Sequence, residues 1–265
     1  MADLRNGFGQ ARTRTGAGAV AMDEGLRAYM LRVYNYMAGG VLLTGLVAMA
    51  VYALAVTSDP NAAAAVAGGT RQLARGQYLT PFGYAMFVSP LKWLVAFAPL
   101  GIVFLLAFRV HTMSVAAAQF WFWAYAALVG ASLSVLLLVY THTSISRVFF
   151  ITAAAFGALS LYGYTTKKDI SGWGTFLIMG VIGIIIASLV NLFLQSSGLQ
   201  FAISCIGVLV FSGLTAYDTQ QIKESYSEHL DGTALGHGAI MGALQLYLDF
   251  INLFTSMLSL FGNRN

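Results

Sequence analysis

The sequence predicts an all-α integral membrane protein with seven transmembrane helices, six of which surround a central C-terminal helix. The first observation is composition: 58% of the 265 residues are hydrophobic and only 9% are charged, whereas a water-soluble domain carries about 25% charged residues. The second is a series of seven apolar segments of helix length. The third is a line of polar residues on one face of the last segment.

The same composition excludes several other classes of protein. The single cysteine, Cys205, cannot form an internal disulfide, and the four scattered histidines lack the spacing of metal ligands. The net charge of +4 gathers near the N-terminus rather than along one helix face, which does not favour nucleic-acid binding. We therefore predict no cofactor, no metal site and no nucleic-acid partner.

Apolar segments that can cross a hydrocarbon core of about 30 Å, at about 20 residues each, follow one another along the chain. Five of them are long, and they lie near residues 34–57, 91–109, 120–140, 173–194 and 240–261. Two shorter segments, near 148–165 and 201–218, are each followed by a polar break, so we count them as spans. The longest connection, 58–90, is expected to be an exposed outer loop.

The first 28 residues are expected to form a flexible cytoplasmic tail, ahead of a seven-helix membrane domain over residues 29–265. The tail holds Arg5, Arg12, Arg14 and Arg27 among Gly, Ala and Thr. It lacks the short apolar core and the cleavage site of a signal peptide.

The distribution of Lys and Arg predicts that the N-terminus is cytoplasmic. Nine basic residues then fall on the inner side: Arg5, Arg12, Arg14, Arg27, Arg32, Arg109, Lys167, Lys168 and Lys223. Five fall on the outer side: Arg71, Arg75, Lys92, Arg147 and Arg264. Cytoplasmic segments carry the excess of positive charge, and an odd number of spans places the C-terminus outside.

Two acidic residues do not belong to a tail or a loop. Asp249 lies inside the last span, where a carboxylate that faced lipid would cost at least ~2.5 kcal/mol, so its side chain must face protein or water. The alternative is a structural role, in which the Asp249 side chain forms a hydrogen bond in the bundle core. Asp218 closes the sixth span, a position that suits a solvated helix end as well as a gate, and it could meet Asp249 if it is still helical and points inward.

Polar residues recur along the last span at spacings of four, three, four and three. They are Gln245, Asp249, Asn252, Ser256 and Ser259, and this spacing places them on one helical face. A helix surrounded by the other six could line a hydrated path with such a face. We therefore predict that Gln245, Asn252 and Ser256 line a pore.

Three stretches of the sequence, AYDTQQIK, ALQLYLDFINLF and GALSLYGYTTKKDISGWGTFL, resemble the Bax inhibitor-1 family, in particular its bacterial YccA/YbhL-like branch. The resemblance covers residues from about 30 to 262. It implies six helices around a central seventh, an inner-membrane location, a calcium leak, and pH sensitivity through an aspartate pair. Asp218 and Asp249 match that pair, and Arg109 matches the arginine that contacts it.

The sequence leaves three functions to consider. The first is a pH-sensitive channel that leaks calcium ions and is gated by the aspartate pair. The second, also implied by the resemblance, is a regulator that binds and restrains an FtsH-type membrane protease through the basic tail or the 219–239 connection. The third is an intramembrane aspartyl protease, which the sequence disfavours because Asp249 lacks the Gly-x-Gly-Asp context of those enzymes. We predict that the chain is not an enzyme and has no catalytic residues.

Overall fold

The computed structural model describes residues 3–63, 65–66, 69–70, 73 and 76–264. Within them, seven helices are long and apolar enough to cross a membrane, and they confirm the seven predicted spans. The long helices are α1 (Asp3–Ala55), α3 (Leu91–Arg109), α4 (Val115–Leu133), α6 (His142–Thr165), α7 (Gly174–Leu194), α8 (Ser197–Glu224) and α9 (Gly232–Phe261).

Short elements connect these helices. After α1 come β1 (Val56–Thr57), η1 (Pro60–Ala62), β2 (Ala65–Val66), β3 (Gly69–Thr70), β4 (Tyr78–Leu79) and α2 (Pro81–Phe87). Strand β1 pairs antiparallel with β4, and β2 pairs antiparallel with β3. Three further pieces are η3 (Val110–Thr112), α5 (Leu136–Val139) and η4 (Ser171–Trp173). Arg71 and Arg75, which the charge count placed outside, lie outside the described residues.

The sequence fixes several helix starts through a hydroxyl or carboxylate at the N-cap. Such a side chain accepts a hydrogen bond from a backbone N–H that the first turn leaves unpaired. The caps of α2, α4, α6, α8 and α9 are Thr80, Ser114, Thr141, Ser196 and Asp231. Helix α7 ends at Leu194. The next residue, Gln195, takes the left-handed conformation with φ 50°, and α8 begins two residues later at Ser197.

Three helix boundaries in the structure differ from the boundaries predicted from the sequence. The predicted tail, residues 1–28, is helical from Asp3 onward, and the span begins at Glu24. There the helix packs on the α8–α9 connection, where the rings of Tyr29 and Tyr226 lie 5.5 Å apart. Helix α8 runs six residues beyond Asp218, and α9 begins at Gly232, so the predicted 219–239 connection shrinks to residues 225–231.

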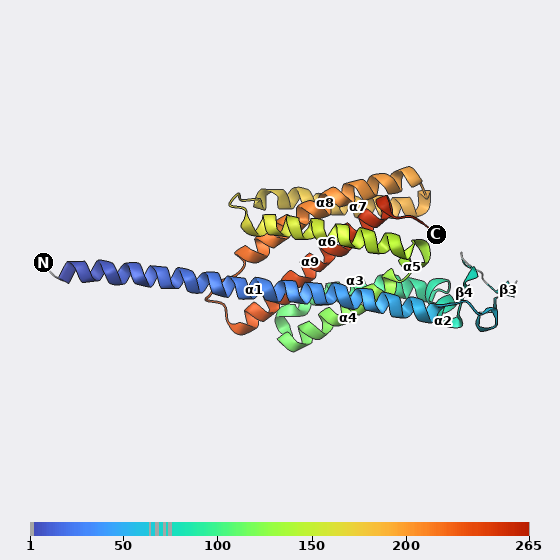
Figure 1. Ribbon diagram of the computed structural model, residues 1–265, viewed down its shortest axis with the longest axis horizontal. Coiled ribbons are helices and arrows are strands. Elements are labelled where there is room, and N and C mark those ends of the chain that lie inside the picture. The colour runs from blue at the N-terminus through green and yellow to red at the C-terminus, as the bar shows by residue number, and fades with distance from the viewer. Residues whose placement is uncertain (1–2, 64, 67–68, 71–72, 74–75, 265) are drawn as a thin grey trace.

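Helix α9 runs obliquely between two groups of helices (Figure 1): α1, α3 and α4 on one side, and α6, α7 and α8 on the other. It packs mainly against α1, α4, α6 and α8, while α3 lies against α4 and α7 lies against α8. The predicted central position of α9 is therefore confirmed, with the refinement that α3 and α7 are outer helices.

A hydrogen-bonded contact ties α9 to α1 and α4. The fully buried Tyr247 shares a hydrogen bond of 2.6 Å with the hydroxyl of Thr44, and that hydroxyl donates to the carbonyl of Ala126 at 2.9 Å. The ring of Tyr247 also meets Phe122 and Tyr125 edge to face. Polar groups that are removed from water must be paired in this way, since an unpaired one costs a few kcal/mol.

Glycines let two pairs of helices approach closely. A Cβ added at Gly163 on α6 would collide with the carbonyl oxygen of Ala216 on α8, and a Cβ added at Gly130 on α4 would lie 2.6 Å from the carbonyl oxygen of Thr44 on α1. Small residues at such contacts are typical of helices that pack inside a membrane.

We expect Gly163→Val to lower the free energy of unfolding by about 1–3 kcal/mol, the usual cost of overpacking, because α6 and α8 must move apart. Thermal unfolding in detergent measures this change. The control is Gly157→Val on the same helix, where an added Cβ meets no atom within 4 Å. Equal melting temperatures for the two variants would contradict the close contact.

Candidate functional site

The two carboxylates predicted as a pair lie next to each other. Asp218 on α8 and Asp249 on α9 are close enough for their carboxyl groups to interact electrostatically. Asp249 is 4% exposed and Asp218 is half-buried. Among the described residues, Oδ2 of Asp249 has no donor. Since an ionised carboxylate only accepts hydrogen bonds, a bond between the two groups requires one shared proton.

A chain of hydroxyls holds α8 in position beside Asp218. Thr219 shares a hydrogen bond of 2.9 Å with Ser160 on α6, and Ser160 shares one of 2.6 Å with Tyr34 on α1. The hydroxyls of Thr215 and Thr219 also bond to carbonyls one turn earlier in α8. Sequence reasoning missed this chain, although Thr215 and Thr219 lie within one turn of Asp218.

The end of α8 beyond Asp218 is anchored to the connection between α6 and α7. The buried Gln220 accepts a hydrogen bond from the backbone N–H of Ile170 at 3.0 Å and donates to the carbonyl of Lys168 at 2.9 Å. Lys223 donates to the carbonyl of Tyr164 at 2.9 Å. These bonds explain why the helix continues through the predicted polar break, since its polar side chains are paired inside the protein.

Of the three predicted pore-lining residues, Ser256 lies at the contact between α8 and α9. Ser256 faces Gly207 of α8, where an added Cβ would lie 2.6 Å from the serine oxygen. Asn252 is half-buried and donates to the carbonyl of Leu248 in its own helix at 2.8 Å. Gln245 is exposed. The polar face therefore borders α8 at Ser256 and is exposed at Gln245, while α1, α4 and α6 also pack against α9.

The far end of this contact opens into a polar pocket of about 440 Å³ that includes Arg264. Gln200 on α8 lies at its centre: it accepts a hydrogen bond from Asn191 at 3.1 Å and reaches Ser259 on α9 at 3.5 Å. We call the line of residues from the carboxylates to this pocket the α8–α9 seam, and its members are Asp218, Asp249, Gly207, Ser256, Gln200 and Ser259.

Apolar side chains interrupt the seam between the carboxylates and Ser256. Val210, Phe211 and Leu214 on α8 pack with the fully buried Leu253 on α9 and with Leu177 on α7. This cluster separates the two polar ends of the seam.

Arg109 is the last residue of α3. It is exposed at the end of α3, which packs on α4 rather than on α9. Its carbonyl accepts a hydrogen bond from Thr112, and no ion pair to Asp218 or Asp249 is formed within the described part of the chain. The contact implied for Arg109 stays a prediction.

The donor set at the seam is small for a resident metal ion. Across the described residues, no group of three or more His, Cys, Asp and Glu side chains is placed to share one. A calcium ion takes 6–8 oxygen ligands, more than the two carboxylates supply.

Comparison with known proteins identifies the family of this chain. Residues 26–265 match the family described as "Inhibitor of apoptosis-promoting Bax1". The chain belongs to the Bax inhibitor-1 family. An uncharacterised protein of Rickettsia prowazekii is 46% identical over 242 residues, which cover 91% of this chain and 92% of the relative. Inner membrane protein YbhL of Escherichia coli is 43% identical over 242 residues, which cover 91% and 93%.

A relative from Caulobacter vibrioides extends the match to nearly the whole chain. It is 43% identical over 263 residues, which cover 99% of this chain and 98% of the relative. The match therefore includes the helical segment before Glu24, as well as the Bax inhibitor-1 membrane domain.

We expect Asp249→Asn to keep the Bax inhibitor-1 domain folded, since an amide keeps the shape and can hydrogen-bond to Asp218. Asp249→Leu should lower the free energy of unfolding by about 1–3 kcal/mol, because the half-buried Asp218 loses its polar neighbour. Thermal unfolding in detergent distinguishes the two. The control is Asp169→Leu at an exposed connection, which should change little; an Asp249→Leu variant as stable as the wild type would count against a paired carboxylate.

Proposed function

We propose that the protein is a pH-sensitive, calcium-permeable leak channel in which the Asp218–Asp249 pair gates the α8–α9 seam. The observation that carries the proposal is the pair itself, two neighbouring carboxylates inside membrane-spanning helices. Intramembrane acids are costly and mark ion paths and proton relays. Because the E. coli relative is named an inner membrane protein, we also place this chain in that membrane, with the N-terminus cytoplasmic.

The gating step follows from the charge of the pair. A shared proton links α8 to α9 through a hydrogen bond between the two carboxyl groups. Its loss leaves two like charges in a partly desolvated site, and their repulsion favours separation of the helices. Separation would part the apolar cluster around Leu253 and Phe211 and connect the carboxylates with the polar pocket at Gln200 and Ser259.

We therefore expect calcium flux to rise with pH through the titration of the shared proton. The measurement is dye-reported calcium entry into liposomes that contain only the purified protein, at a series of pH values. Asp218→Asn and Asp249→Asn should each flatten the response, and the double variant should add little. An interaction energy of about 0.5–3 kcal/mol between the two sites is expected for coupled residues.

Asp169→Asn is the matched control for the flux measurement, because this carboxylate is exposed on the α6–α7 connection and accepts only a local hydrogen bond from Ser171. It should leave the pH response unchanged. Additive effects of Asp218→Asn and Asp249→Asn, or full pH dependence in either single variant, would refute gating by the pair.

A further inference from the structure

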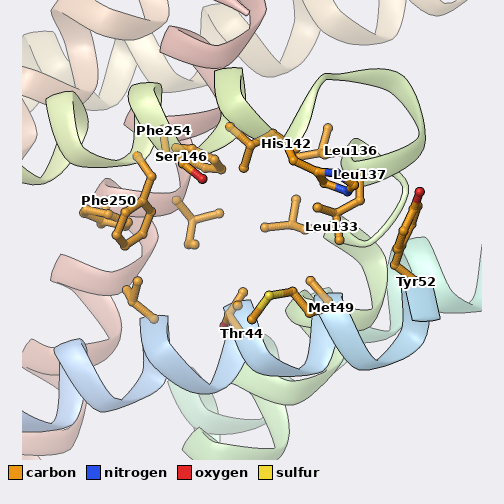
Figure 2. Close-up of a pocket in the computed structure, with 16 residues that line it drawn as sticks. Thr44, Met49, Tyr52, Leu133, Leu136, Leu137, His142, Ser146, Phe250 and Phe254 are labelled. Atoms are coloured by element: carbon orange, nitrogen blue, oxygen red, sulfur yellow. The ribbon is translucent and has the colours of Figure 1, made fainter. Parts of the chain in front are cut away.

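A second space in the bundle lies on the opposite side of α9 from the seam. It has a volume of about 360 Å³ and lies between α1 and α6. Figure 2 shows side chains from both helices pointing into it, with Phe250 and Phe254 of α9 at one end and Tyr52 at the other. We call it the α1–α6 cavity; sixteen residues line it, among them Gly45, Met49, Ser146, Phe149, Phe250 and Phe254.

The deep end of the α1–α6 cavity is apolar. The ring of Phe149 meets Phe250 at 5.6 Å and Phe254 at 6.0 Å, both edge to face. Thr44 is the polar residue at this depth, and its hydroxyl already bonds to Ala126 and Tyr247. The deep end therefore favours a ligand made of hydrocarbon.

The other end of the cavity is polar and lies where the helices begin and end. Tyr52 is three residues before the end of α1, and His142 is the first residue of α6; their rings meet edge to face at 5.4 Å. Tyr52 donates a hydrogen bond to Gln77 at 3.2 Å. Aromatic residues with a polar atom occupy the headgroup level of a bilayer, so this end is expected to lie at the membrane surface.

The cavity opens sideways between α1 and α6, toward the surrounding bilayer. Met49 is 55% exposed, and Gly45, His142 and Ser146 are also exposed. The lining on α1 extends from Val41 to Tyr52, and at 1.5 Å per residue this is a length of about 16 Å. One leaflet of a hydrocarbon core of roughly 30 Å is about 15 Å deep. The cavity thus matches the depth of a single leaflet.

We propose that the α1–α6 cavity binds one acyl chain of a membrane phospholipid, with the headgroup beside Tyr52 and His142. The chain enters through the gap at Met49 and ends against Phe250 and Phe254. The imidazole of His142 and the hydroxyl of Ser146 are hydrogen-bond donors that suit the phosphate and ester oxygens of the headgroup region. The site is separate from the carboxylate pair, so a test of lipid binding does not depend on whether the protein leaks calcium.

The test uses the full chain in vesicles of phosphatidylethanolamine and phosphatidylglycerol that contain a phosphatidylethanolamine with a diazirine at the end of one acyl chain. After illumination, mass spectrometry maps the labelled residues. We expect label at Phe250 and Phe254 in excess of label at Phe176, which is 75% exposed on α7. Gly45→Leu should abolish that excess, because a side chain there enters open space within the cavity.

The matched control is Gly157→Leu, an exposed glycine of α6 that also faces open space but does not line the cavity; its labelling should equal that of the wild type. If Gly45→Leu fails to fold, Ser146→Leu fills the cavity from the opposite wall. Wild-type label at Phe250 no higher than at Phe176, or label that survives a folded filling variant, would overturn the proposal. So would labelling by a diazirine fatty acid that excess phospholipid does not displace.

Discussion

One constraint organises the structure: the carboxylate of Asp249 sits on a helix that crosses the membrane, and it must be covered by protein. A carboxylate left facing hydrocarbon would cost at least ~2.5 kcal/mol, a large part of the stability of a typical domain. Placing α9 between two groups of helices removes that cost, and the neighbouring Asp218 supplies a group that can share a proton with it. The positions of α8, α6 and α1 follow from the need to surround this pair.

The polar residues around the pair are satisfied without ion pairs within the described residues. Hydroxyls of Thr215 and Thr219 bond to carbonyls of their own helix, and the Tyr34–Ser160–Thr219 chain crosses three helices. Neutral hydrogen bonds of this kind pair polar atoms at a lower desolvation cost than buried charges. A change in the protonation of the two carboxylates would therefore act on a frame of paired hydroxyl groups.

The sequence was sufficient to predict the spans and to single out Asp218 and Asp249 as acids outside the tails and loops, because hydropathy and helical spacing are local properties. It could not show which neighbour each face meets. The polar face of α9 predicted a path in the middle of the bundle, yet Ser256 meets Gly207 of α8 and Gln245 is exposed. Rotation of a helix about its axis depends on small residues in other helices, such as Gly207 of α8 opposite Ser256, and a hydropathy pattern does not contain that information.

The two faces of α9 offer a physical link between the proposed lipid site and the proposed gate. Asp249 and Ser256 face the seam, whereas Phe250 and Phe254 face the α1–α6 cavity. A helix that moves away from α8 must move toward that cavity or carry α1 and α6 with it, because the side chains are closely packed. An acyl chain in the cavity shifts the equilibrium between the closed and the separated seam only if the chain binds the cavity with different affinity in the two arrangements. If separation of α8 and α9 narrows the cavity, a bound acyl chain opposes opening of the seam. By reciprocity, the protonated pair, which holds the seam closed, strengthens binding of the acyl chain.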